Sequence, residues 1–251
     1  MIRSFIGATC LSLVFAFAEA SEVRENKELA VSSEAPLERA KDLINNIVQD
    51  NNQYSELENT KHYVPFMNSQ TPRATMVYCS DSRVQTLNFT QTPENDLFTV
   101  RNIGNQLATA EGSVDYGVNI LKTPVLIFVG HSDCGAIKAA VQDYGNLSDP
   151  VKKELGTLDV NKGGDVNKEI VNNVHNQVDR AMKLFEGRVK DGGLVILGAI
   201  YDFRNDFKHG MGKLVFVNVN GVKDCAQIEK DSILTDIPNV HIGVSCAQPV
   251  R

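Results

Sequence analysis

Residues 124–136 read PVLIFVGHSDCGA. The run from Val125 to Val129 is continuously apolar, Pro124 can begin a strand but not continue one, and Gly130 ends the run. A short apolar run with such boundaries is typical of a strand buried on both faces, and strands of that kind occur in parallel sheets covered by helices. The stretch therefore predicts an α/β fold, with polar residues placed directly after a buried strand.

Apolar runs and helical segments alternate on both sides of this strand. Further short apolar runs lie at 74–78, 96–100, 194–200 and 214–219. Helices are predicted at 110–121, 136–144 and 166–186, the first and last from their three-to-four apolar spacing. Because alternating strands and helices form parallel sheets, we expect a central, mostly parallel β-sheet flanked by helices, in one domain over residues 73–251.

An N-terminal arm with helices is expected over residues 21–72. Residues 21–32 are charged and are expected to be loose. Pro36 then opens a segment in which apolar residues, from Leu37 to Val48, recur at the spacing of an amphipathic helix. The polar stretch 50–59 is expected to end that helix.

Residues 1–20 have the pattern of a secretory signal peptide. Arg3 precedes an apolar run from Phe5 to Phe17, and Ala18-Glu19-Ala20 matches a small-x-small cleavage site. The apolar run is shorter than the roughly 20 residues that span a bilayer, which disfavours the alternative of an uncleaved anchor. We expect cleavage near Ala20 and a secreted or periplasmic chain with no remaining membrane span.

Composition restricts the class of partner. The 251 residues carry a net charge of −6 and are 42% hydrophobic, which is ordinary for a soluble globular domain. Neutralising phosphates requires a basic patch or stripe, and none is visible in the sequence. Nucleic acid is therefore not an expected partner.

The five cysteines fall into three groups. Cys10 lies within the signal segment. Cys225 and Cys246 stand among ordinary residues and are candidates for a disulfide, with two unpaired thiols as the alternative. Cys79 and Cys134 each lie in a polar cluster that a structural bridge does not require.

Cys79, His131 and Cys134 form a predicted metal site. Cys79 follows the run 74–78 directly, and His131 and Cys134 follow the run 125–129. The carboxyl ends of parallel strands share one edge of the sheet, where ligands of α/β proteins bind. Two thiolates and an imidazole select Zn²⁺, and three protein ligands leave a fourth position free, as in catalytic zinc sites.

Asp81 and Arg83 allow two arrangements beside such a metal. Asp81 could fill the fourth position itself. Alternatively, a bidentate ion pair with Arg83 could hold the carboxylate off the metal, where it would accept a hydrogen bond from metal-bound water. Without Cys79 nearby, a plain salt bridge at a strand end would be the preferred interpretation.

The pattern Cys79-Ser80-Asp81-Ser82-Arg83, followed by His131-x-x-Cys134-Gly135, resembles the signature of the β-class carbonic anhydrases. The resemblance extends over about residues 70–216 and includes Arg101-Asn102, Asn173-Val174…Gln177 and Tyr201-Asp202. It implies reversible hydration of carbon dioxide to bicarbonate and a proton by zinc-bound hydroxide. The implied zinc ligands are Cys79, His131 and Cys134, and the implied catalytic pair is Asp81 with Arg83. The family also implies a homodimer or homotetramer whose N-terminal helices embrace the partner subunit.

Substrate-binding residues carry over from the resemblance in the same way. Gln70 is similar to a glutamine that hydrogen-bonds substrate from the neighbouring subunit, and Gly135 offers a backbone amide. Phe98, Ile103 and Tyr116 resemble the apolar wall of a carbon dioxide pocket, with ordinary core packing as the alternative for each. The chain contains no tryptophan, unlike the bacterial branch that binds inhibitory bicarbonate through one.

Two rival functions use the same residues. Hydrolysis of carbonyl sulfide or carbon disulfide would need a different tunnel but the same zinc ligands. A non-catalytic zinc-binding or dithiol redox protein would use Cys79 and Cys134 alone, and the adjacent Asp81-Arg83 pair argues against it because neither role needs a tethered carboxylate.

Overall fold

The computed structural model describes residues 36–58 and 60–243. The predicted signal peptide, its cleavage site and Cys246 lie outside these residues. The chain divides into two compact units, Met1–Met67 and Asn68–Arg251. Within the described residues, no helix combines the length and the apolar character needed to cross a bilayer.

The described part of the first unit consists of the helices α2 (Pro36–Leu57) and α3 (Thr60–Tyr63). The first helix ends within the predicted stretch 50–59, but only after continuing through most of it to Leu57. No glycine or proline interrupts residues 37–57, and polar side chains pair along the helix, as in Lys41 with Glu38 at 2.9 Å. No residue of α2 is buried, and its apolar residues 43, 44, 47 and 48 are exposed.

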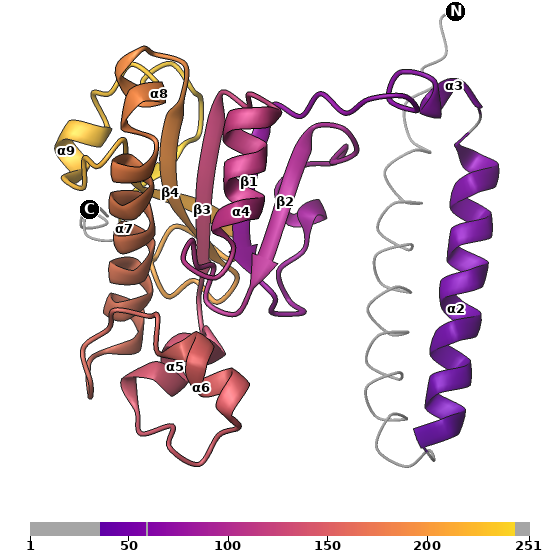
Figure 1. Ribbon diagram of the computed structural model, residues 1–251, viewed down its shortest axis with the longest axis horizontal. Helices are drawn as coiled ribbons and strands as arrows, with labels where there is room; N and C mark the ends of the chain where they lie inside the picture. Colours follow the sequence, from indigo (N-terminus) through magenta and orange to yellow (C-terminus); the bar gives the residue numbers. More distant parts are fainter. Residues whose placement is uncertain (1–35, 59, 244–251) are drawn as a thin grey trace, which may run out of the picture. The chain divides into compact units, whose positions relative to one another are not determined.

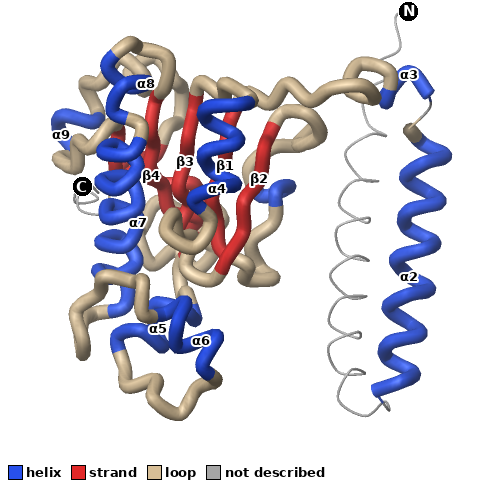
Figure 2. Tube along the Cα trace, in the orientation of Figure 1, coloured by secondary structure: helices blue, strands red, loops and turns tan. Residues whose placement is uncertain are grey.

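The second unit is built on a six-stranded sheet in the order β2-β1-β3-β4-β5-β6. The strands are β1 (Ala74–Cys79), β2 (Leu97–Asn102), β3 (Val125–His131), β4 (Val195–Asp202), β5 (Lys213–Val219) and β6 (His241–Ile242). The first four are parallel, β5 is antiparallel to β4, and β6 is parallel to β5. The predicted mostly parallel central sheet flanked by helices is confirmed (Figures 1 and 2).

The helices of this unit are α4 (Glu111–Asp115), α5 (Gly135–Val141), α6 (Asp149–Leu155), α7 (Val166–Leu184), α8 (Glu186–Lys190) and α9 (Cys225–Ile228). A short 3₁₀ turn, η1 (Thr86–Asn88), lies between β1 and β2, and α4 continues as a π-helical turn, η2 (Tyr116–Ile120). The helix predicted over 136–144 ends at Val141, since the backbone of Gln142 is extended. Lys162 Nζ donates to the carbonyl oxygens of Ala140 and Gln142 at 2.8 and 2.9 Å and so caps this end.

Both faces of the sheet are buried, as the continuous apolar runs indicate. On one face Val77, Leu126 and Phe128 are fully buried against α4, η2 and α7. Figure 1 shows α4 and α7 in front of the strands on this face. On the other face Met76 and Ile127 pack with residues of α9 and the segment that follows it. This period-two alternation leaves the carboxyl ends of β1 and β3 as the places where polar side chains can gather.

Candidate metal centre

The three residues predicted as metal ligands lie together at the carboxyl edge of the sheet. Cys79 ends β1, His131 ends the neighbouring strand β3, and Cys134 immediately precedes α5. Their exposed fractions are 4%, 0% and 1%. One donor atom from each lies within 4.8 Å of the other two, so the three side chains could converge on one metal ion.

The ring of His131 presents a free nitrogen to this cluster. Its Nδ1 lies 2.9 Å from the carbonyl oxygen of Ser132, and a carbonyl only accepts, so the ring proton is on Nδ1. The lone pair is then on Nε2, which is buried and has no hydrogen-bond partner in the described chain. A hydrogen bond that fixes the tautomer while the other nitrogen stays unpartnered is the usual arrangement of a metal-binding histidine.

Cys79 and Cys134 are free thiols. The neighbouring Cys134 thiol, with help from His131 and a backbone amide, lowers the pKa of Cys79 well below its usual value. The contact with Cys79 and deep burial raise the pKa of Cys134. A second thiolate at this spot therefore needs a nearby positive charge, and a divalent cation would provide it. The donor set of two sulfurs and one imidazole nitrogen fits Zn²⁺.

Asp81 is held by Arg83 through both carboxylate oxygens. Arg83 Nε donates to Oδ1 at 2.9 Å and Nη2 donates to Oδ2 at 2.7 Å, and the Arg83 backbone amide also reaches Oδ1 at 3.0 Å. The hydrogen bond from Arg83 lowers the pKa of Asp81 to about 2. Oδ2 lies 3.9 Å from His131 Nε2 and accepts this one hydrogen bond, so it retains a lone pair beside the centre.

Arg83 is itself fixed by residues that the sequence analysis did not single out. Its Nη1 donates to Asp133 Oδ2 at 3.0 Å, and its guanidinium lies 4.7 Å from the centre of the Phe203 ring. Asp133 also pairs with Lys138 and, at 2.6 Å, with Arg204. The position of Asp133, between His131 and Cys134 in the sequence, could have indicated a role at the site. No local feature of the sequence indicated one for Phe203.

Arg101, noted in the sequence resemblance, secures the loop that carries Asp81. Its guanidinium donates to the backbone carbonyls of Cys79 at 3.1 Å, Asp81 at 3.0 Å and Val84 at 2.8 Å. Three carbonyls tied to one guanidinium limit the freedom of residues 79–84. Because the backbone at Asp81 is fixed in this way, the directions in which its side chain can point are restricted.

The predicted substrate residues do not all gather at the centre within one chain. Phe98 and Tyr116 contact each other, with ring centres 5.8 Å apart. Phe98 precedes Asn102, the register partner of Cys79, by four residues, which is about 13 Å along a strand. Ile103, in contrast, follows Asn102 directly at the edge where Cys79 lies.

Two further predicted residues are exposed. Gly135 begins α5 directly after Cys134, and a side chain built on it would meet no atom within 4 Å. Gly135 is itself exposed, directly beside the buried Cys134. Gln70 lies exposed before β1, and the described contacts do not bring it to the three ligands.

Residues 74–207, more than half of the chain, match the family model described as carbonic anhydrase. The chain belongs to the carbonic anhydrase family. A carbonic anhydrase of Mycolicibacterium smegmatis is 38% identical over 74 residues, which cover 29% of this chain and 36% of the relative. One of Pseudomonas aeruginosa is 40% identical over 77 residues, covering 28% and 35%. The chain thus spans about a third of the length of these curated relatives.

Solved structures of β-carbonic anhydrases share the fold. A tetrameric enzyme from the filamentous ascomycete Sordaria macrospora superposes with a TM-score of 0.61 at 21% identity, over 70% of this chain and 98% of that one. The β-carbonic anhydrase CcaA gives a TM-score of 0.60 at 20% identity, over 72% and 95%. At these identities the likeness supports the β-class fold of this member of the family.

Proposed function

We propose that the protein catalyses the reversible hydration of carbon dioxide to bicarbonate and a proton, with Zn²⁺ held by Cys79, His131 and Cys134. The observation that carries the proposal is the buried, unpartnered Nε2 of His131 among two free thiols, with the Arg83-held carboxylate of Asp81 at its side. A zinc ion bound there would supply a Lewis acid that makes water nucleophilic near neutral pH.

Asp81 would orient the attacking water. Its Oδ2 has a free lone pair 3.9 Å from His131 Nε2, and the two hydrogen bonds from the Arg83 side chain keep the carboxylate ionised. A carboxylate that is ionised and cannot rotate away accepts a hydrogen bond from the water. It thereby orients the water and draws the proton away from its oxygen. The bidentate pairing supports the arrangement in which Asp81 stays off the metal rather than filling the fourth position.

The apolar wall for carbon dioxide would be completed by a second copy of the chain. Ile103 lies at the edge of its own centre, but Phe98 is set back along β2, and Tyr116 is 45% exposed. Tyr116, with the partly buried Phe98 packed against it, is suited to a neighbour's centre because it is exposed and remote from its own, and the exposed Gln70 fits the same role. We therefore propose a homodimer or homotetramer, with the backbone amide of the exposed Gly135 available to bicarbonate.

We further propose that the mature protein is secreted or periplasmic. Cys225 forms a disulfide, and disulfides persist in oxidising compartments. Its pairing with Cys246 stays a prediction, because Cys246 lies outside the described residues. N-terminal sequencing of the protein recovered from the medium or the cell envelope should begin near Ser21, and a chain that retains Met1 in the cytosol would contradict this proposal.

The decisive test measures bound zinc and carbon dioxide hydration on the same purified protein. We expect about one zinc per chain and rapid hydration in stopped flow, with both lost in Cys134→Ala and zinc retained in the surface control Lys190→Ala. Hydrolysis of carbonyl sulfide or carbon disulfide without carbon dioxide hydration would favour the first rival. A protein without metal, or one in which Cys79 and Cys134 form a disulfide, would refute the zinc centre.

A further inference from the structure

The segment 103–107 places a backbone amide beside Cys79 Sγ, one of the two sulfurs of the proposed metal centre. The N–H of Gly104 donates to Cys79 Sγ at 3.4 Å, in a buried environment. Gly104 has φ +81° and Asn105 has φ +46°, so two consecutive residues are in the left-handed region. A Cβ on Gly104 would also lie 3.2 Å from Leu158 Cδ2. Glycine adopts this region freely and asparagine tolerates it, so the sequence permits the turn, and hydrogen bonds from the rest of the chain fix its position.

Two amide side chains of α7 hold the segment. Gln177 Oε1 accepts from the backbone N–H of Leu107 at 2.8 Å, and Gln177 Nε2 donates to Asn173 Oδ1 at 2.9 Å. Asn173 Nδ2 donates in turn to the carbonyl of Gly104 at 2.9 Å. The two side chains, spaced four residues apart on one helix face, thus join the backbone at both ends of the segment in a single chain of hydrogen bonds. We call this pair the amide clip.

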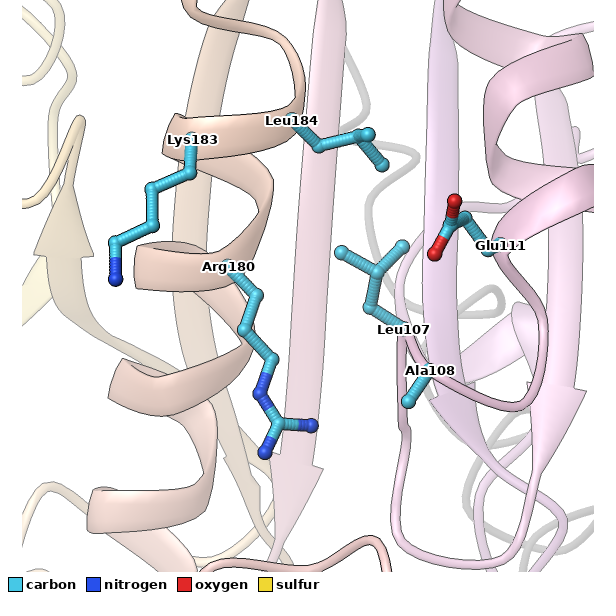
Figure 3. A pocket seen from close by; sticks show the side chains of 6 residues that line it. All are labelled: Leu107, Ala108, Glu111, Arg180, Lys183 and Leu184. Atoms are coloured by element: carbon cyan, nitrogen blue, oxygen red, sulfur yellow. The ribbon is translucent and has the colours of Figure 1, made fainter.

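The amide clip is isolated from solvent. Asn173 and Gln177 are 1% and 0% exposed, and neither can ionise. Figure 3 shows the outer side of the same region, where Leu107 and Ala108 face Arg180 and Leu184 of α7 across a groove of about 460 Å³. Leu107 itself is 3% exposed, so it separates the clip from that groove. Water therefore cannot easily replace a hydrogen bond removed from the clip.

We propose that Asn173 and Gln177 are positioning residues of the metal centre, which hold the Gly104 amide against Cys79 Sγ and so tune the charge that this sulfur gives to the metal. The inference rests on the proposed zinc centre. Two thiolates together cancel the charge of a divalent cation, and an amide hydrogen bond withdraws electron density from one of them. The bound metal then stays a stronger Lewis acid than two unmodified thiolates would allow. The position of the Gly104 amide, and hence its effect on Cys79 Sγ, depends on α7, a helix that supplies no metal ligand.

The test replaces zinc by Co²⁺ in the full chain and records the thiolate-to-cobalt charge-transfer absorption. Asn173→Leu removes the bond to Gly104, and Gln177→Met removes the bond to Leu107 while keeping the side-chain length. Asn176→Leu is the matched control, because Asn176 also donates from α7 to a backbone carbonyl, that of Asp159, at 2.9 Å. Circular dichroism and urea unfolding establish that each variant is folded.

Loss of the amide hydrogen bond raises the energy of the sulfur electrons, so we expect the charge-transfer band to move to longer wavelength in both clip variants. We expect the control to keep the wild-type band. The clip variants should also hold Cys79 less well in position, so zinc affinity, measured by competition with a chelator, should fall about tenfold. A wild-type band and zinc affinity in a folded Asn173→Leu or Gln177→Met protein would overturn the inference. If the wild-type protein gives no thiolate-to-cobalt band at all, the metal centre itself is refuted, which is a separate outcome.

Discussion

His131 offers Nε2 to the centre because the carbonyl of Ser132 occupies its other nitrogen. Asp81 is treated in the same way, since Arg83 holds the carboxylate in place at both oxygens while leaving one lone pair of Oδ2 unused. In both cases a neighbour that is not a ligand determines which atom of the functional side chain remains available. Reactivity at this scale therefore follows from hydrogen bonds made behind the reacting atoms.

Asp81→Asn should keep its zinc and lose most of its activity. The amide matches the carboxylate in shape but cannot hold the proton of the attacking water, so we expect kcat/KM for carbon dioxide hydration to fall by at least about 100-fold. Stopped-flow hydration and zinc content would be measured together. Asp143→Asn, at an exposed carboxylate in the loop after α5, serves as the control. Wild-type turnover in the Asp81 variant would remove this residue from the mechanism.

His175 should make the free energy of unfolding depend on pH. Burial, and to a smaller extent Lys223, lower the pKa of His175 to about 4, against the opposing effect of Asp179. Its Nδ1 accepts from Asn218 Nδ2 at 3.2 Å, which requires the neutral ring. The unfolded chain, with the usual pKa near 6.5, binds the proton more readily. Stability from this residue is therefore present above pH 6.5 and is lost as the pH falls towards 4.

Urea unfolding of the wild type and of His175→Gln at several pH values would measure this contribution. The difference between the two proteins cancels the effect of all other titrating groups. We expect the wild type to lose its advantage between pH 6.5 and about pH 4. A difference that stays constant across this range would show that His175 does not titrate with folding.

At the scale of elements, how closely α7 packs on the sheet determines how far the polar side chains of this helix reach. Gly130 of β3 and Gly198 of β4 leave room for Val174, since a Cβ would lie 2.8 and 2.7 Å from its two methyl carbons. Val174 is fully buried and neighbours Asn173, so the depth of the helix and the reach of the amide clip are linked. Packing of an apolar residue thus contributes to the geometry of a polar contact.

Gly198→Ala should destabilise the protein by about 1–3 kcal/mol, because the added methyl group overlaps Val174. Val174→Ala should relieve the overlap, so the double variant should be more stable than the sum of the two single effects predicts. Urea unfolding measures all three. Gly187→Ala is the control, since a Cβ there meets nothing within 4 Å. A Gly198→Ala protein as stable as the wild type would show that the helix accommodates the methyl group freely.

For the whole molecule, we propose that one chain by itself does not complete the substrate site. The proposed ligands and Asp81 lie at one edge of the sheet, whereas Phe98 lies about 13 Å back along β2, in contact with Tyr116. The first unit adds a helix, α2, with no buried residue. Association of two chains would bring the aromatic pair of one to the centre of the other under this proposal.

Mixing two inactive variants would test this arrangement. One carries Asp81→Asn, and the other carries Phe98→Ala with Tyr116→Ala. If the aromatic pair serves the neighbouring subunit, a mixed assembly contains one site with intact Asp81 and intact aromatic residues, and hydration activity should return after co-expression. Light scattering should give the mass of a dimer or tetramer. A monomeric mass, or mixed protein as inactive as its components, would contradict the shared site.

The sequence by itself determined the α/β fold and the meeting of Cys79 with His131. Continuous apolar runs reveal buried strands, and residues that directly follow two such parallel strands must lie at one edge of the sheet. The ligand types then followed from their chemistry. These inferences succeed because they depend on local hydrophobicity and on a rule that holds for parallel sheets in general.

The tertiary structure alone decided which partners complete the site. The pairing of Asp133 with Arg83, 50 residues apart, and the bond from Asn173 to Gly104, 69 residues apart, leave no periodic trace in the chain. The pairing of Asp81 with Arg83 is local, but only the rotamers show that it is bidentate. The extent of α2 and the antiparallel direction of β5 were equally invisible. Such features depend on distances between elements, and those are set by how the whole sheet and its helices pack.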